Sequence, residues 1–310
     1  MLDLRRLRLL HELHRRGTIA AVADALQFTP SAVSQQLAVL ERETGVALTQ
    51  KDGRGVRLTD AGLVLAEQAA RLLDQARRAE AELAAATHEP SGRGRIAAFQ
   101  SVALYIAAPA IAQLARTAPK LRTELIDAEP EQALPALALG DLDLVLADEW
   151  AGQPLPRLEG IDRHDLHVEP LLLVLPKDHP AAHARGRKAK VPLAELRDAP
   201  WVGAPPGGGW ESMILRTCRD LGGFEPEIRH RTNDAIVACE LVAHGQAVTL
   251  LPELTDPGRN PGVTTRRVAD GDVHRTVLAA TRTADAQRPS IRALLDAVRA
   301  AGHARGWRSS

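Results

Sequence analysis

The stretch QFTPSAVSQQLAVLE, residues 27–41, combines a helix start with apolar residues at the helical interval. Thr29 is a good helix-capping residue, and Pro30 suits the first helical position, where its missing N–H costs nothing. The apolar residues that recur with helical spacing are Val33, Leu37 and Leu40. They predict one buried face of a helix over residues 30–44, ended by a glycine at position 45.

The opposite face of this helix is polar, short-chained and nearly uncharged. It carries Ser31, Ser34, Gln35, Ala38 and Arg42. Such a surface suits the major groove of double-stranded DNA, where donors and acceptors on base edges are matched one by one. Gln35 can pair bidentately with adenine, and the serines can reach bases or phosphates. A merely solvated helix face is the alternative that this face alone leaves open.

Two further helices are expected before this one. Leucines at positions 4, 7, 10 and 13 predict an amphipathic helix that ends at Gly17. Thr18 can cap a second helix over residues 19–26. After a break at residues 27–28, the third helix begins near Thr29 and Pro30, where free N–H groups can meet a phosphate.

The segment ALTQKDGRGVRLT, residues 47–59, predicts two short strands around a glycine-containing turn. Lys51, Arg54 and Arg57 lie in or beside that turn, and their charges would attract the DNA backbone whatever its sequence. A basic hairpin directly after a helix-turn-helix is a wing. Residues 1–59 are therefore predicted to form a winged helix-turn-helix domain that binds DNA.

Residues 60–87 predict a long helix that would extend roughly 40 Å. Its apolar residues follow a four-three repeat: Leu65, Ala69, Leu72, Ala76, Ala79, Leu83 and Ala86. This repeat is typical of a coiled-coil seam and predicts a partner chain, with docking of the helix on its own protein as the alternative. A hinge or linker is expected over residues 88–94, which are rich in glycine and polar residues.

The remaining residues, 95–310, alternate strand-like and helical runs and predict an α/β domain with mostly parallel strands. The chain is thus expected to be an α+β multidomain protein. Acidic and basic residues number 39 each, so any contact with nucleic acid must be local. No apolar run approaches the ~18 residues that span a bilayer, and no secretion signal is evident. We therefore expect a cytoplasmic protein without membrane contact.

Residues 4–62 resemble the DNA-binding domain of LysR-type transcriptional regulators. The resemblance rests on the small-residue helix at 20–26, on TPSAVSQ at 29–35, and on LTDAG at 58–62. Two positions depart from the family pattern, since Thr49 replaces a usual aromatic residue and Lys51 a usual arginine. We expect a slightly less firmly packed wing base as a result.

The resemblance continues more weakly beyond residue 95 and implies two α/β lobes with a ligand cleft, similar to periplasmic binding proteins. It places the first lobe at about 95–163 and 267–310 and the second at about 164–266. The implied hinges lie near residues 162–166 and 263–267. It also implies a homodimer or homotetramer on DNA, with RNA polymerase as a further partner.

Ligands of open α/β sheets bind beyond the carboxyl ends of strands and face helix N-termini. The residues expected there are Gln100, Ser101, Asp148, Gly207, Thr232, Asn233 and Thr249. Hydroxyls and free N–H groups at helix starts favour an anion, so we expect a small carboxylate-bearing metabolite, with Asp148 meeting an amine. Ordinary helix capping is the alternative for each polar residue. Trp150, Trp201 and Trp210 either wall this cleft or pack in the core, and no cofactor is expected.

Two other functions remain open at this point. A thiol-based redox sensor of the same family needs a cysteine pair, but Glu225 occupies the position expected for the thiol that would partner Cys218. Cys239 is the only other cysteine. The alternative from another class is an enzyme or receptor that uses its winged helix for another purpose. No nucleophile-elbow, zinc-protease, phosphate-loop or dinucleotide motif supports an enzyme, so no catalytic or metal-binding residue is assigned.

Overall fold

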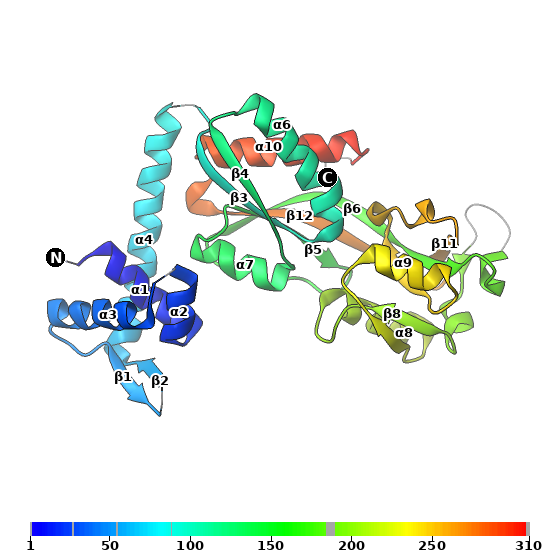
Figure 1. Ribbon diagram of the computed structural model, residues 1–310, viewed down its shortest axis with the longest axis horizontal. Helices are drawn as coiled ribbons and strands as arrows, with labels where there is room; N and C mark the ends of the chain where they lie inside the picture. The colour runs from blue at the N-terminus through cyan, green and yellow to red at the C-terminus, as the bar shows by residue number, and fades with distance from the viewer. Residues whose placement is uncertain (1, 27, 54, 88, 184–189, 308–310) are drawn as a thin grey trace. The chain divides into compact units, whose positions relative to one another are not determined.

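The computed structural model describes residues 2–26, 28–53, 55–87, 89–183 and 190–307 (Figure 1). The chain forms two compact units. The first comprises residues 1–88 with the short segment 284–288, and the second comprises residues 89–283 and 289–310. No helix in the described ranges has the length and apolar content that crossing a membrane requires.

The first unit begins with three helices: α1 (Leu4–Arg16), α2 (Ile19–Leu26) and α3 (Pro30–Thr44). These bounds agree with the predicted ranges because the capping residues act as the sequence indicates. Thr29 accepts a hydrogen bond from the N–H of Ala32 at 3.2 Å and so caps α3. Gly17 and Gly45 end α1 and α3 in the left-handed conformation that favours glycine.

The three helices pack around one apolar core. Its buried side chains include Leu7, Leu10, Leu13, Val33, Leu37 and Leu40, none more than 3% exposed. Full burial of a side chain of this size stabilises the fold by about 1.5–3 kcal/mol. Leu4 differs from the predicted stripe because it lies in the first turn of α1 and stays 45% exposed.

The hairpin after α3 consists of β1 (Thr49–Asp52) and β2 (Gly55–Leu58), which pair antiparallel. Its base is held by the carboxylate of Glu41 on α3. The Oε1 atom accepts from the N–H groups of Leu48 and Thr49 at 2.9 Å and from the Thr49 hydroxyl at 3.0 Å. Thr49, which we expected to loosen the wing base, instead adds a hydrogen bond there.

The long helix α4 (Asp60–Thr87) has 28 residues, and its predicted partner-facing stripe divides into two parts. Leu65 and Ala69 pack into the core of their own unit, where α4 runs beside α1. Leu72 and Leu83 are 44% and 74% exposed. The first part of the stripe therefore docks on its own unit, as the alternative had it, and the exposed leucines are the part left for a partner chain.

The second unit is built on an eight-stranded sheet with the order β4-β3-β5-β12-β6-β11-β7 and with β10 beside β6. Its strands are β3 (Gly92–Ala98), β4 (Leu121–Asp127), β5 (Leu144–Trp150), β6 (Ile161–Pro176), β7 (Lys190–Val191), β10 (Thr249–Pro252), β11 (Val263–Val268) and β12 (His274–Arg282). A separate two-stranded sheet pairs β8 (Pro200–Gly203) with β9 (Glu227–Arg231). β3 starts inside the range 88–94 that we expected to be linker, because its residues pair along β4 from position 92 onward.

The helices of this unit are α5 (Gln100–Val102), α6 (Ala108–Thr117), α7 (Pro130–Leu139), α8 (Gly209–Gly222), α9 (Ala235–Ala243) and α10 (Pro289–Ala304). A π-helical turn over Ala103–Ala107 joins α5 to α6. The helices α6 and α10 cover one face of the first strands and α7 covers the other (Figure 1). Alternate residues of β3 follow this arrangement, since Ile96 packs towards α6 and α10 while Ala97 packs towards α7.

The sheet is mixed, and the prediction of mostly parallel strands was wrong. β3 pairs parallel with β4 and β5, but β12 is antiparallel to both β5 and β6. β10 and β11 are also antiparallel to β6. The antiparallel pairing of β6 and β12 arises because β6 leads the chain out of the first half of the unit and β12 leads it back in, so the two strands run side by side in opposite directions.

These halves are the two lobes. The first lobe contains β3, β4, β5 and β12 with α5, α6, α7 and α10, and the second contains β7 to β11 with α8 and α9. β6 runs through both, pairing with β12 over residues 161–170 and with β10 and β11 over residues 171–176. The expected hinges at 162–166 and 263–267 therefore need correction. The first range lies within an unbroken strand, and β11 belongs to the second lobe, so the return crossing lies between residues 268 and 274.

Substitution of Glu41 by alanine is expected to lower the free energy of unfolding of the first unit by about 1–3 kcal/mol, because two backbone N–H groups lose their acceptor. Glu41→Gln keeps an acceptor oxygen and should lose less. Glu43→Ala is the matched control, since Glu43 pairs with Arg6 at the surface and should cost less than about 1 kcal/mol. Denaturant unfolding followed by helical circular dichroism measures all three. Equal losses for Glu41→Ala and Glu43→Ala would contradict the anchoring role.

Candidate functional site

The outer face of α3 is exposed along its length. The residues predicted to face DNA that are exposed there are Thr29, Pro30, Ser31, Ser34, Gln35 and Arg42. Gln35 lies at its centre, and its side-chain amide has no hydrogen-bond partner within the described part of the chain. An amide with both its donor and acceptor free is the group that pairs bidentately with adenine.

The hydroxyl groups of this face are partly used by the helix itself. The Ser34 hydroxyl donates to the carbonyl of Pro30 at 2.9 Å, which leaves its oxygen free to accept. The hydroxyls of Thr29 and Ser31 lie 3.0 Å apart and share a hydrogen bond. The hydroxyls of Thr29, Ser31 and Ser34 are therefore partly engaged within the helix start, whereas the amide of Gln35 keeps its full hydrogen-bonding capacity.

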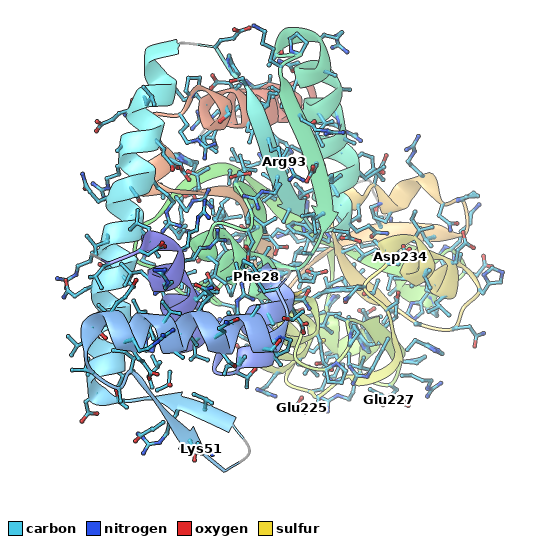
Figure 2. The ribbon with its side chains drawn as sticks, turned by 60° about the vertical axis from the view of Figure 1, so that its left-hand side comes forward. Phe28, Lys51, Arg93, Glu225, Glu227 and Asp234 are labelled. Atoms are coloured by element: carbon cyan, nitrogen blue, oxygen red, sulfur yellow. The ribbon has the colours of Figure 1, made fainter. Side chains whose placement is uncertain are left out.

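The wing presents its cations differently. Lys51 is exposed on β1 and has no ion-pair partner among the described residues (Figure 2). The guanidinium of Arg57 lies 2.8 Å from the side-chain amide of Gln50, whose oxygen accepts from it. Arg54, the third predicted wing cation, lies outside the described residues. Lys51 is thus the clearest candidate for a phosphate contact.

One exposed aromatic residue was not predicted as part of this surface. Phe28 precedes the start of α3 and is 56% exposed (Figure 2). The sequence indicated only a break in the helices at this position. An apolar ring beside the α3 N-terminus offers contact area to a thymine methyl or to a sugar.

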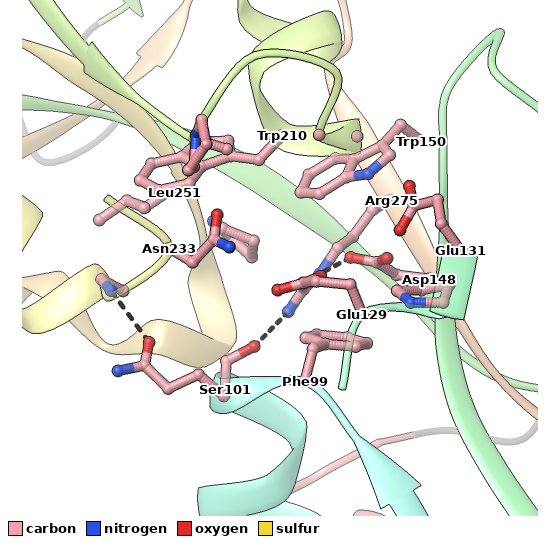
Figure 3. A pocket seen from close by; sticks show the side chains of 18 of the residues that line it. Phe99, Ser101, Glu129, Glu131, Asp148, Trp150, Trp210, Asn233, Leu251 and Arg275 are labelled. Atoms are coloured by element: carbon pink, nitrogen blue, oxygen red, sulfur yellow. Dashed lines mark hydrogen bonds and ion pairs between the residues drawn. The ribbon is translucent and has the colours of Figure 1, made fainter. Parts of the chain in front are cut away.

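In the second unit, a cavity of about 290 Å³ opens between the two lobes (Figure 3). The predicted effector residues that line it are Gln100, Ser101, Asp148, Gly207 and Asn233. Thr232 and Thr249 do not line it. Thr249 is fully buried and donates to the carbonyl of Val202 at 2.8 Å, while the Thr232 hydroxyl accepts from the N–H of Asp234 at 3.0 Å. Both hydroxyls are therefore bonded within the chain, that of Thr232 to the residue that caps α9 and that of Thr249 to a strand 47 residues away.

The floor of the cavity is formed by Arg275 on β12, which sequence reasoning missed. Its side chain is 3% exposed and binds Asp148 at 2.9 Å, Glu169 at 2.7 Å and the Ser101 hydroxyl at 3.1 Å. Its guanidinium also lies over the rings of Phe99 and Trp150, at 5.1 and 5.6 Å from their centroids. Asp148 is therefore paired with an arginine of the protein, which corrects the expectation that it meets an amine of the ligand.

Two hydrogen bonds join the lobes beside the cavity. The Gln100 side chain, from the first lobe, donates to Asp234 at 2.7 Å and accepts from the N–H of Ala235 at 2.9 Å. Asp234 caps α9 in the second lobe. Gln100 thus bonds the other lobe directly in addition to lining the cavity.

The lobes also approach closely at the start of α8. A Cβ atom on Gly209 would lie 2.9 Å from the indole nitrogen of Trp150 in the first lobe, so only glycine allows this approach. Trp150 and Trp210 both line the cavity, whereas Trp201 is fully buried in the second lobe. Two of the three tryptophans thus wall the cavity, and the third packs in the core.

The charged side chains that line the cavity are mostly acidic. Glu129 and Glu131, at the start of α7, line the cavity together with Asp148, and Arg275 is the one cation among its described lining residues. Glu129 is exposed as a whole residue, but desolvation of its carboxyl at the cavity wall, together with the nearby carboxylates of Asp148, Glu131 and Asp127, raises its pKa to about 7. The expectation of a carboxylate ligand therefore lacks a free cation to support it.

Both thiols are buried. Burial raises the pKa of Cys218 to about 12 and that of Cys239 to about 11. A thiol is oxidised through its thiolate, so these cysteines are poorly disposed to react with an oxidant. No group of three metal-binding side chains that could hold an ion occurs in the described ranges.

Comparison with known proteins covers nearly the whole chain. Residues 4–63 match the bacterial regulatory helix-turn-helix proteins of the lysR family, and residues 87–302 match the LysR substrate binding domain. The HTH-type transcriptional regulator TfdS of Cupriavidus pinatubonensis is 28% identical over 301 residues, which is 96% of this chain and 98% of TfdS. The hydrogen peroxide-inducible genes activator of Escherichia coli is 27% identical over 301 residues, covering 96% and 95%. A full-length OxyR variant from Pseudomonas aeruginosa has the same fold, with a TM-score of 0.69, 23% identity and coverage of 100% and 99%.

Replacing Gln35 by alanine is expected to reduce discrimination between a preferred and a scrambled DNA site by about 1–3 kcal/mol, because a bidentate base contact is lost. Non-specific binding should be nearly unchanged. Competition binding with both duplexes measures the difference. Gln36→Ala is a control on the same helix, since Gln36 already binds Arg6. A parallel loss of affinity for both duplexes in Gln35→Ala would show that Gln35 does not read a base.

Replacing Lys51 by alanine should weaken binding to every DNA sequence and lower the slope of log affinity against log salt by about one unit, because one fewer counterion is released. Lys177→Ala, in the second unit, serves as the charge-matched control and should leave the slope unchanged. Fluorescence anisotropy over a salt series gives both slopes. An unchanged slope in Lys51→Ala would place the wing away from phosphate.

Proposed function

The chain belongs to the LysR family of transcriptional regulators, and on that premise we propose that it reads a specific DNA sequence and responds to a small molecule held between its two lobes. The observation that carries the proposal is the presence, in one chain, of an exposed α3 face centred on Gln35 and a cavity bridged by lobe-to-lobe contacts. The first supplies base recognition, and the second supplies a site whose occupancy can alter the protein's conformation.

DNA recognition divides between α3 and the wing. Gln35 reads a base edge in the major groove, while Ser31, Ser34 and Arg42 position the helix against bases and phosphates. Lys51 adds attraction that does not depend on sequence. Support comes from the exposure of these side chains and from the absence of any partner for Gln35 and Lys51 within the described ranges.

The effector acts by shifting the closure of the lobes. Gln100 bonds α9 across the cleft, and Trp150 contacts the start of α8. A ligand that fits the cavity better in one closure state than in another changes the populations of the two states. The size of the response is set by the ratio of the two affinities and not by the total affinity.

The protein acts as a homodimer or as a homotetramer of two dimers. The exposed part of the α4 stripe, with Leu72 and Leu83, supports a partner chain, because exposed leucines at heptad spacing are stabilised by burial against a second helix. A twofold partner places two α3 helices in successive major grooves of an inverted repeat. Contact with RNA polymerase would then depend on how the DNA is bent.

Redox sensing is the less favoured alternative within the family. A relative of this chain carries the name of a hydrogen peroxide-inducible genes activator. The thiols of Cys218 and Cys239 are buried, and their pKa values are raised. Glu225 occupies the position where a redox sensor would carry its second thiol, and it forms a salt bridge with Arg219 at 2.5 Å. These features support a ligand-responsive regulator over a thiol-responsive one.

Selection of bound duplexes from a random DNA pool tests this proposal. The full-length protein is expected to enrich an inverted repeat whose half-sites lie about one helical turn apart, or a multiple of that spacing. Gln35→Ala should enrich a weaker or altered consensus from the same pool. A pool that remains random after repeated selection at low ionic strength would contradict sequence-specific binding.

A further inference from the structure

The cavity between the lobes has an acidic lining. Its described carboxylates are those of Glu129, Glu131 and Asp148, and Glu169 lies directly behind Arg275. Arg275 balances at most one of these charges. The cavity therefore has a negative electrostatic character before any ligand enters.

Arg275 cannot serve a ligand carboxylate in this arrangement. Its guanidinium already bonds Asp148, Glu169 and the Ser101 hydroxyl, and its face lies over Phe99 and Trp150. An entering anion would have to displace one of two buried carboxylates and leave that carboxylate without a partner. Leaving a buried charge unpaired is strongly unfavourable, so this arginine is committed to the protein.

Several N–H donors beside the cavity are bonded within the chain. In the turn before α8, the N–H of Gly207 donates to the carboxylate of Glu211 at 2.9 Å. At α9, Ala235 donates to Gln100, and the next two N–H groups donate to Asp234. The N–H donors at the start of α9 are therefore satisfied by side chains of the chain itself, whereas α8 begins without a side-chain capping bond.

Two carboxylates remain available for a ligand. Glu129 and Glu131 line the cavity and have no ion-pair or hydrogen-bond partner within the described ranges, and the Glu129 side chain points into the cavity in front of Arg275 (Figure 3). Glu129 stands at the N-cap position of α7 but makes no capping bond, so the helix does not use its carboxylate. Opposite them, Trp210 donates its indole N–H to the carbonyl of Leu250 at 2.9 Å, which turns its ring towards the cavity.

We infer that the cavity takes a cationic effector, an organic amine or ammonium compound, with Glu129 and Glu131 as its anionic partners and Trp210 as an aromatic wall. A cation bound beside a carboxylate gains a charge-assisted contact, and an aromatic face adds a cation–π contribution. The inference rests on the proposed role of the cavity as the effector site and names the chemical class of the effector.

Binding of a cation here is linked to pH through Glu129. The charged groups facing it are Asp127 at the end of β4, Glu131 on α7, Asp148 on β5 and Arg275 on β12. Because the pKa of Glu129 is raised to about 7, part of the population is protonated at neutral pH and must lose its proton to pair with a cation. Affinity for a cation should therefore rise about tenfold between roughly pH 6 and pH 8, and affinity for an anion should fall.

Three small probes of equal chain length test the charge preference. Butylammonium, butan-1-ol and butanoate carry a positive, zero and negative charge, and the amine stays charged across the pH range because amine pKa values lie near 10. Calorimetry on the full-length protein without DNA, at constant ionic strength, measures binding, and tryptophan fluorescence reports on the cavity. Butylammonium is expected to bind in the millimolar range, ahead of the alcohol and the carboxylate.

Variants connect the binding to the two carboxylates. Glu129→Gln should weaken butylammonium binding about tenfold and flatten its pH dependence, because the titrating partner is lost. Glu131→Gln should weaken it while keeping the pH dependence. Glu227→Gln is the charge-matched control, since Glu227 is exposed and pairs with Arg229 on β9 (Figure 2). Circular dichroism confirms that each variant is folded.

Three results would overturn the inference: butanoate binding as tightly as butylammonium, Glu129→Gln binding butylammonium as well as the natural chain, or no binding by any probe at millimolar concentrations. None of these results bears on the enrichment of an inverted DNA repeat, which is measured without ligand. Failure of the charge preference is therefore distinguishable from failure of the proposed DNA-reading function.

Discussion

The buried side chain of Arg275 is the interaction on which the architecture of the second unit depends. It joins β12, which carries it, to Asp148 on β5, Glu169 on β6 and Ser101 on α5. Removing one partner of such a buried ion pair costs about 3–5 kcal/mol, because the other charge is left without compensation. The network therefore holds β5, β12 and β6 in register at the point where the chain crosses between lobes.

The same network decides the chemistry of the cavity. An arginine at the floor of a ligand site would ordinarily favour an anion, but here two carboxylates occupy it. The free charges left at the rim are those of Glu129 and Glu131. The polar residues around the cleft do not by themselves indicate the charge of its ligand. That charge depends on which side chains are already paired within the protein and which remain unpaired.

The DNA-binding unit is organised on a smaller scale. Glu41 ties the wing to α3 through contacts seven and eight residues away, and Thr29 caps its own helix. Neighbouring turns thus determine where Gln35 and Lys51 lie. The effector unit requires contacts between distant segments, and its cavity exists only where two lobes meet. The geometry of the DNA-binding surface is therefore set by residues close together in the sequence, whereas the geometry of the cavity is set by residues far apart in the sequence.

The sequence by itself determined the parts whose signals are local. Helix caps, the apolar stripe of Val33, Leu37 and Leu40 and the glycine-containing turn predicted α1, α2, α3 and the wing with correct bounds, and left Gln35 exposed. The tertiary structure alone decided the mixed sheet, the position of the lobe crossing and the charge of the cavity. Arg275 lies 127 residues from Asp148 and 174 from Ser101, and no periodicity in the sequence encodes such a contact. The physical reason is that a capping bond forms within one turn of chain, whereas the pairing of a buried charge depends on which strands the whole fold brings together.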